Sequence, residues 1–264
     1  MLTINKIYFN RLNSQNEKNK KNKIMKGICV ISARGGSRGL PNKNIRNLLG
    51  KPLIAWSINQ AKQVSEIKKI VVSTDSEQIA AIAREYGAET PFLRPAKLST
   101  SSSGKFQVFK HAFQACVKYF KEEYDFFLDL DCTNPLRDVS DIYSIILKYK
   151  KLHKKKGIDG LFSICEARKN PYFNLVEEDK NGFLKLSKKN KKKNVVRRQD
   201  APKVFEHVAS MYVLSPKYLL AANSLLEGNL QGYNIGQEKS FDIDSELDFK
   251  IVEFLMKEKL NLNS

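Results

Sequence analysis

The sequence predicts an α/β fold with a mostly parallel β-sheet, helices on both of its faces and one inserted arm. Three observations lead to this prediction: short apolar runs alternate with segments of helical apolar spacing, a glycine-rich turn follows the first apolar run, and the pattern changes after about residue 158. The chain has 264 residues, of which 42% are hydrophobic, so it can bury the core of one large domain with an insertion, or of two domains.

Expected strands and helices alternate between residues 27 and 152. The strands are short and apolar, and the helices carry apolar residues three and four positions apart. We expect strands at 27–32, 68–75 and 124–131, and helices at 52–64, 76–87, 106–123 and 139–152. This alternation is typical of a parallel sheet, because each helix carries the chain back across one face. The body is therefore predicted to be Rossmann-like.

The second part of the chain combines strands with a hairpin. Residues 160–167 and 208–216 have the apolar character of strands, and two short runs on either side of DKNG at 179–182 predict a β-hairpin. Residues 240–260 are expected to form a short strand and then an amphipathic helix. We predict a domain over residues 25–264 that contains an inserted arm at about 165–205.

The net charge of +18 comes from three segments. Residues 1–24 and 148–156 carry six Lys or Arg side chains each, residues 185–198 carry eight, and the rest of the chain is close to neutral. Residues 1–24 lack apolar periodicity, so we expect a basic disordered tail, or a stretch that is not normally translated because Met25 resembles a start. The lysine runs lack a regular interleaving of aromatic residues, which favours solvated charge over nucleic-acid binding.

Membrane and disulfide-bonded classes are not indicated. No apolar run approaches the roughly 18 residues of a membrane span, and Asn and Lys occupy the region where a signal peptide would be apolar. We therefore expect a cytoplasmic protein. The four cysteines lie far apart without a C-x-x-C pair, so neither a zinc site nor a disulfide framework is indicated. They are expected to be reduced and partly buried.

The stretch ISARGGSRGLPNKNI at 31–45 predicts an anion site at the end of the first strand. Open α/β sheets bind ligands at the carboxyl ends of their strands, and the glycines at 35 and 36 let backbone amides approach an anion. Arg34, Arg38 and Lys43 add positive charge. The loop fits neither the Walker A pattern nor G-x-G-x-x-G, so it predicts a polyphosphate site of another kind. The alternative is a surface turn with solvated arginines.

Pairs of aspartates suggest where a divalent cation would bind. Asp242 and Asp244 are two residues apart, so in an extended segment both face the same side and can hold Mg²⁺. Asp244 could instead cap the helix that begins near residue 245. Asp131, the last residue of the expected strand at 124–131, is left open as a ligand or a partner of loop backbone. His111 and His207 are expected to be structural, and no proton acceptor is assigned.

Five segments in order resemble the acylneuraminate cytidylyltransferase family, the CMP-nonulosonate synthetases. They are ISARGGSRGLPNKNIRNLLGKPLIAWSI, VVSTDSEQIAAIAREYGAETPFLRP, TNPLR, RRQDAPKVF and FDIDSELDFKI, and the similarity extends from about Met25 to Leu260. The resemblance implies a nucleotide-diphospho-sugar transferase fold and a Mg²⁺-dependent reaction that couples CTP to a nonulosonic acid and releases pyrophosphate. It also implies a homodimer whose exchanged arm lies near the partner's sugar pocket.

The resemblance also implies roles for individual residues. Arg34, Lys43 and Asp244 would be catalytic, and Asp242 and Asp244 would bind the metal. CTP would be bound by Arg34, Gly35, Gly36, Ser37, Arg38, Asn44 and Asp131. The sugar acid would be bound by Arg198 and Gln199.

Two departures from the family pattern concern the substrate. Sialic acid enzymes typically have LQPTSPLR where this chain has LDCTNPLR, so Asp131 replaces a glutamine, and NGAIY is replaced by VASMY at 208–212. The sugar is therefore open among legionaminate, pseudaminate and N-acetylneuraminate, with legionaminate preferred. The alternatives are an octulosonate cytidylyltransferase and a non-catalytic nucleotide-binding or RNA-binding protein.

Overall fold

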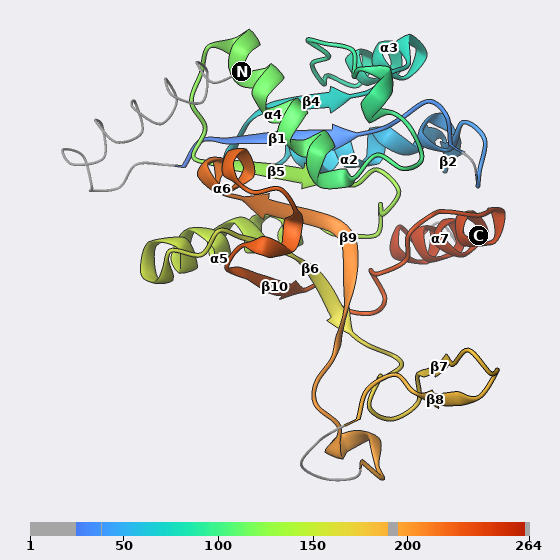
Figure 1. Cartoon of the computed structure of the whole chain (residues 1–264). Coiled ribbons are helices and arrows are strands. Elements are labelled where there is room, and N and C mark those ends of the chain that lie inside the picture. The colour runs from blue at the N-terminus through green and yellow to red at the C-terminus, as the bar shows by residue number, and fades with distance from the viewer. Residues whose placement is uncertain (1–24, 38, 190–194, 262–264) are drawn as a thin grey trace.

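A six-stranded sheet forms the centre of the protein, with the strand order β10-β6-β9-β5-β1-β4 (Figure 1). The structure is a computed structural model that describes residues 25–37, 39–189 and 195–261. The expected tail at 1–24 and Arg38 of the glycine-rich loop lie outside the described residues. The disorder of the tail and the role of Arg38 at a phosphate site therefore remain predictions from the sequence.

Most neighbouring strands of this sheet run parallel. The strands are β1 (Gly27–Ser32), β4 (Ile67–Ser73), β5 (Phe126–Leu130), β6 (Gly160–Glu166), β9 (Phe205–Leu214) and β10 (Leu230–Asn234). Only β9 runs antiparallel to its neighbours β5 and β6. It does so because the chain leaves the end of β6 and returns beside it at the same edge. The predicted α/β fold with a mostly parallel sheet is confirmed.

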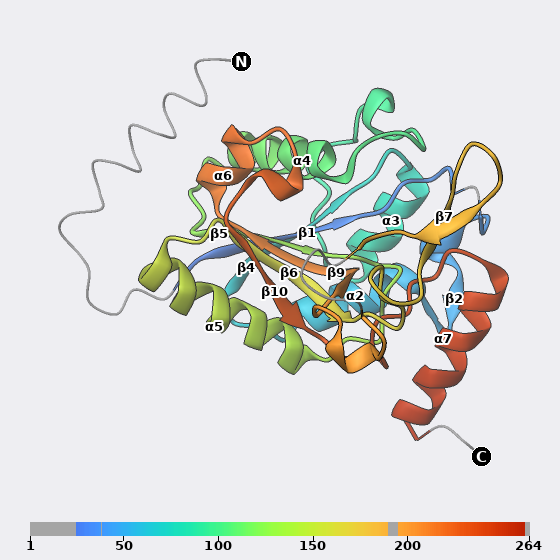
Figure 2. The ribbon, with the colours of Figure 1, turned by 60° about the horizontal axis from the view of Figure 1, so that its bottom comes forward.

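Helices cover both faces of the sheet. The α-helices are α2 (Leu53–Lys62), α3 (Glu77–Glu85), α4 (Lys105–Phe120), α5 (Val139–Lys156), α6 (Pro216–Ala221) and α7 (Glu246–Lys259). The 3₁₀ helices are η1 (Lys43–Ile45), η2 (Ala96–Leu98), η3 (Arg198–Asp200) and η4 (Leu225–Glu227). Figure 2 shows α4 and α6 on one side of the sheet and α5 on the other. Short ladders pair β2 (Asn47–Leu48) with β3 (Lys51–Pro52) and β7 (Val176–Glu178) with β8 (Leu184–Leu186).

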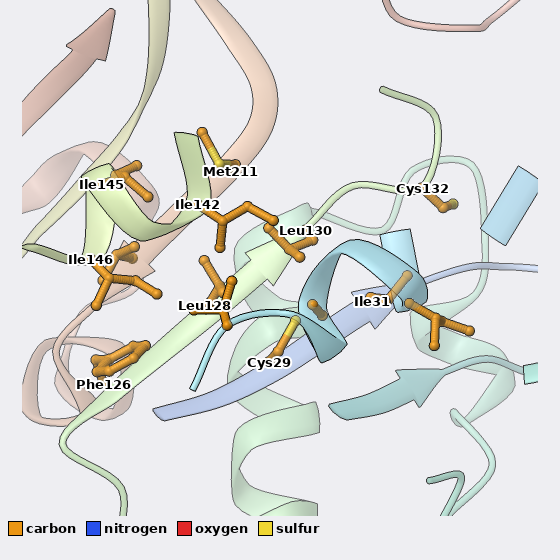
Figure 3. Close-up of a cluster of buried hydrophobic side chains, with 14 of the residues drawn as sticks. Cys29, Ile31, Phe126, Leu128, Leu130, Cys132, Ile142, Ile145, Ile146 and Met211 are labelled. Atoms are coloured by element: carbon orange, nitrogen blue, oxygen red, sulfur yellow. The ribbon is translucent and has the colours of Figure 1, made fainter. Parts of the chain in front are cut away.

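Alternation along the strands fills the two faces. On β5, Phe126, Leu128 and Leu130 point to the face that α5 covers, where they meet side chains of α5 and Cys29 and Ile31 of β1 (Figure 3). The intervening Phe127 packs against α4. These side chains are fully buried, and each contributes about 1.5–3 kcal/mol of transfer free energy. Asp129 also points to the α4 face, because it is two residues from Phe127.

The C-terminal segment differs from its prediction. Residues 241–244 form no strand; the side chain of Asn134 donates to the carbonyls of Lys239 and Phe241, and the amide of Ile243 donates to the carbonyl of Thr133. The segment is extended against the loop after β5 instead of pairing in the sheet. The amphipathic helix that follows is present as α7, which buries Phe249, Val252 and Met256 in a third apolar cluster beside α2.

An arm leaves the sheet between β6 and β9 and projects away from it (Figure 1). It contains the predicted hairpin β7–β8, whose turn is formed by Asp179, which accepts the amides of Asn181 and Phe183, and by Gly182 at φ 83°. Large apolar side chains are exposed along it: Leu175, Val176, Phe183, Leu184, Leu186, Val196 and Phe205. Their concentration on one projecting segment is typical of a surface that another protein covers.

Two further observations concern the class of protein. In the described part of the chain, no helix combines the length and apolar character that a membrane span requires. All four cysteines are buried with free thiols, and burial raises the pKa of Cys116 to about 12.

Candidate active site

A cavity of about 270 Å³ lies beyond the carboxyl ends of β1 and β5. Its charged and amide side chains come from segments far apart in sequence: Arg34, Lys43, Asn44, Arg94, Lys105, Asp131, Asp242 and Asp244. The fold thus brings together most of the residues that the sequence nominated for CTP and metal, because parallel strands direct their following loops to the same edge. Four cations and three carboxylates line it, a combination that fits an anionic ligand bound together with a divalent cation.

The glycine-rich loop reaches this cavity through Arg34, whereas the predicted CTP residues Gly35, Gly36 and Ser37 do not line it. The amide of Gly35 donates to Asp75 Oδ1 at 2.9 Å, and the amide of Ser37 donates to the Gly35 carbonyl. At Gly39, a Cβ atom would lie 2.2 Å from the backbone oxygen of Asp244. Glycine is therefore required there for the loop to lie against the segment that carries the two aspartates.

Lys43 and Asn44 connect the loop to the rest of the site. Lys43 Nζ donates to the carbonyl of Ile243 at 2.6 Å and to Asp244 Oδ1 at 2.9 Å. Asn44 is buried; its Nδ2 donates to the carbonyl of Arg34, and its Oδ1 accepts from Cys132 Sγ at 3.1 Å. The Asn44 amide thus acts on the loop backbone of its own chain, where it positions Arg34 at the cavity wall.

Asp242 and Asp244 line the same cavity from the segment that precedes α7. Asp242 Oδ1 is buried without a hydrogen-bond partner, and burial together with the charge of Asp131 raises the pKa of Asp242. The alternative role of Asp244 as a helix cap is excluded, because Ser245 is the N-cap of α7 and forms a capping box with Asp248. Among the described residues, no group of three or more His, Cys, Asp or Glu side chains forms a complete metal site. Mg²⁺ is commonly held by one or two carboxylates plus substrate phosphates, which this pair fits.

A lysine that the sequence analysis did not nominate pairs with the carboxylates after β5. Lys105 Nζ lies 2.5 Å from Asp131 Oδ2 and 3.5 Å from Asp129 Oδ2. Burial alone would lower the pKa of Lys105, but these two carboxylates raise it above its ordinary value. Burial raises the pKa of Asp129 to about 7. For Asp131, the opposing pull of Lys105 outweighs burial and lowers the pKa.

Arg94 and the loop before α4 complete the cavity and were also missed. Arg94 is buried and donates to the hydroxyl and carbonyl oxygens of Ser73 at the end of β4, and burial lowers the pKa of its guanidinium. Thr100, Ser101 and Ser103 line the same side. The run STSSSGK at the start of α4 could have indicated that this loop lies at the site. Hydroxyl side chains and glycine are frequent where a helix N-terminus faces a ligand.

The predicted sugar-acid residues lie elsewhere. Arg198 and Gln199 line a second cavity of about 410 Å³ on the arm, and Arg198 Nη2 donates to the carbonyl of Ala167 at 2.9 Å. His111 and His207 do not line the first cavity; burial lowers the pKa of both, and each ring packs on an aromatic neighbour. Within the described residues of one chain, six of the residues predicted for CTP, catalysis and metal line one cavity, and the predicted sugar-acid pair lines another: the six are Arg34, Lys43, Asn44, Asp131, Asp242 and Asp244.

Comparisons with known proteins agree with this site. A family model described as cytidylyltransferase matches residues 28–261. Post-translational flagellin modification protein B of Campylobacter coli and CMP-N,N'-diacetyllegionaminic acid synthase of Campylobacter jejuni are 42% and 41% identical over 232 residues, each covering 88% of this chain and 95% of the relative. A pseudaminic acid cytidylyltransferase of C. jejuni is 28% identical over 88% of this chain and 97% of its own length.

A solved structure shares the fold. A CMP:2-keto-3-deoxy-manno-octonic acid synthetase in complex with CTP has a TM-score of 0.65 and 17% sequence identity, and the match covers 89% of this chain and 99% of that one. At this identity the likeness concerns the fold alone. The family match spans nearly all of the described chain and includes every residue that lines the first cavity. The chain belongs to the cytidylyltransferase family and is a nucleotidyltransferase.

Proposed function

We propose that this enzyme transfers CMP from CTP to the anomeric C2 hydroxyl of a nonulosonic acid of the legionaminic type, and releases pyrophosphate. The observation that carries the proposal is the identity of 41% to a CMP-N,N'-diacetyllegionaminic acid synthase across 88% of the chain, against 28% to a pseudaminic acid cytidylyltransferase. This difference supports the preference for legionaminate among the three acids that the sequence analysis left open.

The cations of the cavity fit the chemistry of this transfer. The C2 hydroxyl attacks the α-phosphorus, a bond forms between the sugar oxygen and phosphorus, and the bond to the β-phosphate breaks. Catalysis of such a step is mainly positioning and neutralisation of phosphate charge. Arg34 and Lys43 supply that charge from the loop after β1, and Arg94 supplies it from the neighbouring loop.

A magnesium ion is part of the proposal. Asp242 and Asp244 would hold it together with CTP phosphates, since Asp242 Oδ1 is a buried oxygen without a partner and Asp244 is largely exposed to the cavity. When bound, the ion would neutralise phosphate charge and orient the triphosphate. Lys43 already holds Asp244 in place before any metal arrives, at 2.9 Å.

The sugar acid and the arm imply a homodimer. Arg198 and Gln199 lie on the arm, outside the cavity that would bind CTP in the same chain. The arm also exposes Phe183 and Leu184 at 66% and 65%. Two copies that exchange arms would cover these apolar side chains and bring the sugar-acid residues of one copy toward the CTP of the other. Because CTP is an intracellular metabolite, we place the reaction in the cytoplasm.

The test is pyrophosphate release from CTP and Mg²⁺ with separate sugar acids: N,N'-diacetyllegionaminate, pseudaminate, N-acetylneuraminate and octulosonate. We expect the highest kcat/KM with the first acid. The Asp244→Asn variant serves as a control for contaminating activity. Highest turnover with octulosonate would favour the octulosonate alternative, and CTP binding without any turnover would favour a non-catalytic nucleotide-binding protein.

A further inference from the structure

Lys105 occupies an unfavourable position that the proposed phosphate chemistry does not explain. It is the first residue of α4, whose first turn carries no acidic side chain, so its ammonium lies at the positive end of the helix dipole. Two carboxylates compensate it, Asp131 directly after β5 at 2.5 Å and Asp129 on β5 at 3.5 Å. A cluster that offsets one cation with two carboxylates adds no positive charge for a triphosphate. Its role in the cavity therefore differs from that of Arg34 and Lys43.

The pair has hydrogen-bonding capacity that faces the cavity. Asp131 Oδ1 accepts the amide and the hydroxyl of Thr133, and its Oδ2 accepts from Lys105, which leaves one lone pair on Oδ2. The ammonium of Lys105 has three donors, of which Asp131 and the carbonyl of Ala209 take two. Both side chains line the cavity, with 33% and 17% of their surface exposed. The pair thus presents a donor and an acceptor side by side.

The pair lies on the side of the cavity from which the arm departs. Lys105 Nζ lies 4.7 Å from the ring centre of Tyr212 and contacts the carbonyl of Ala209, and both residues belong to β9, the strand that the arm enters. The phosphate-loop residues follow β1, which β5 separates from β9 in the sheet. A sugar acid that lies between the phosphates and β9 would meet this pair.

We infer that Lys105 and Asp131 form a specificity-determining pair that reads a neutral polar substituent of the sugar acid. The chemistry that fits is a hydroxyl, or a hydroxyl next to an acylamino group, because such substituents both donate and accept. The pair determines which nonulosonic acid is used, so the inference assigns Asp131 to the sugar acid and not to CTP, the role that the family resemblance implied. This inference rests on the proposed function and deepens it.

The test compares acid selectivity in near-isosteric variants. For Asp131→Asn and Lys105→Gln, we expect the ratio of kcat/KM for N,N'-diacetyllegionaminate to that for N-acetylneuraminate to fall on the order of 10- to 100-fold, because a buried polar partner is lost or reversed. The KM for CTP should stay within about twofold of the wild-type value in both variants. Lys110→Met is the matched control: Lys110 is on the same helix, bonds to the carbonyl of Ala222 and does not line the cavity. We expect it to leave the ratio unchanged.

A double variant separates specificity from simple charge loss. Lys105→Gln leaves the charges of Asp131 and Asp129 uncompensated. The double variant Lys105→Gln/Asp131→Asn removes one of these charges, so it should turn over N-acetylneuraminate faster than Lys105→Gln does, while its selectivity for N,N'-diacetyllegionaminate stays low. Calorimetric CTP binding by each variant verifies that it is folded. An equal loss of kcat/KM for every acid, or a raised KM for CTP at unchanged selectivity, would overturn the inference. A wild-type enzyme that turns over no nonulosonic acid would overturn the proposed function first, and the inference with it.

Discussion

Asp244 and Asp248 lie four residues apart, but their replacement should affect different properties. We expect loss of turnover for Asp244 and loss of stability for Asp248. Asp244 is 77% exposed, and its side chain accepts a hydrogen bond from Lys43. Its exposed ion pair contributes less than about 1 kcal/mol to stability. Asp248 Oδ2 accepts the amides of Asp244 and Ser245 and the Ser245 hydroxyl, so it completes the capping box of α7. Loss of such a cap costs about 1 kcal/mol.

Asp244→Asn should therefore lower kcat/KM on the order of 100-fold or more, because a carboxylate that would hold Mg²⁺ becomes a neutral amide. Its melting temperature should stay within about 2 °C of the wild type. Asp248→Asn should lower the melting temperature by about 2 °C and leave kcat within about threefold. Pyrophosphate release at several Mg²⁺ concentrations measures the first effect, and calorimetric Mg²⁺ binding to the CTP complex gives a readout independent of turnover. Turnover above half the wild-type value in Asp244→Asn, with an unchanged Mg²⁺ dependence, would refute the reasoning.

Three other predictions follow from burial and exposure. Burial raises the pKa of Asp129 to about 7. Between about pH 4 and 7 the folded state therefore binds more protons than the unfolded state, and the free energy of unfolding falls as pH rises. Asp129→Asn should reduce this fall by about 4 kcal/mol, as measured by urea titrations of the ligand-free protein at several pH values. Phe183→Lys on the arm should convert a dimer to a monomer by light scattering, whereas Leu247→Lys on the equally exposed face of α7 should not. Arg198→Ala should raise the KM for the sugar acid at least tenfold without changing that for CTP, and an equal rise in both constants would contradict its assignment to the sugar acid.

The sequence predicted the fold well wherever local pattern determines the element. The strand at 27–32 is β1 without a change of boundary, and the hairpin turn at DKNG is present, because alternation and turn residues act over a few residues. The antiparallel direction of β9 was not predictable, because the apolar pattern of a strand does not indicate which strands it pairs with or in which direction. β10 (Leu230–Asn234) was missed because LQGYN is polar and contains a glycine, which an edge strand tolerates.

The candidate site was predictable where its residues lie in one motif. Arg34, Lys43 and Asn44 come from one loop, and Asp242 and Asp244 from one short segment, so their spacing indicated a shared role. Arg94 and Lys105 stand alone in sequence, and their functions depend on the fold that brings them to the end of β5. Asp131 shows how far the sequence alone can predict the site. Its departure from the family pattern was visible, but the sequence did not show that Lys105, 26 residues earlier, would compensate its negative charge.

The cations of this cavity are held by the protein before any substrate arrives. Arg94 bonds to the carbonyl of Ser73, and Lys43 bonds to the carbonyl of Ile243 as well as to Asp244 Oδ1. Backbone carbonyls carry no net charge, so they fix the position of a cation without neutralising it as a carboxylate would. A triphosphate then meets charge that is already oriented, and binding energy is not spent on ordering long side chains. Lys105 has two carboxylates within 3.5 Å and differs in this from Arg94, which supports the proposal that one end of the cavity neutralises phosphates and the other selects the sugar by hydrogen bonds.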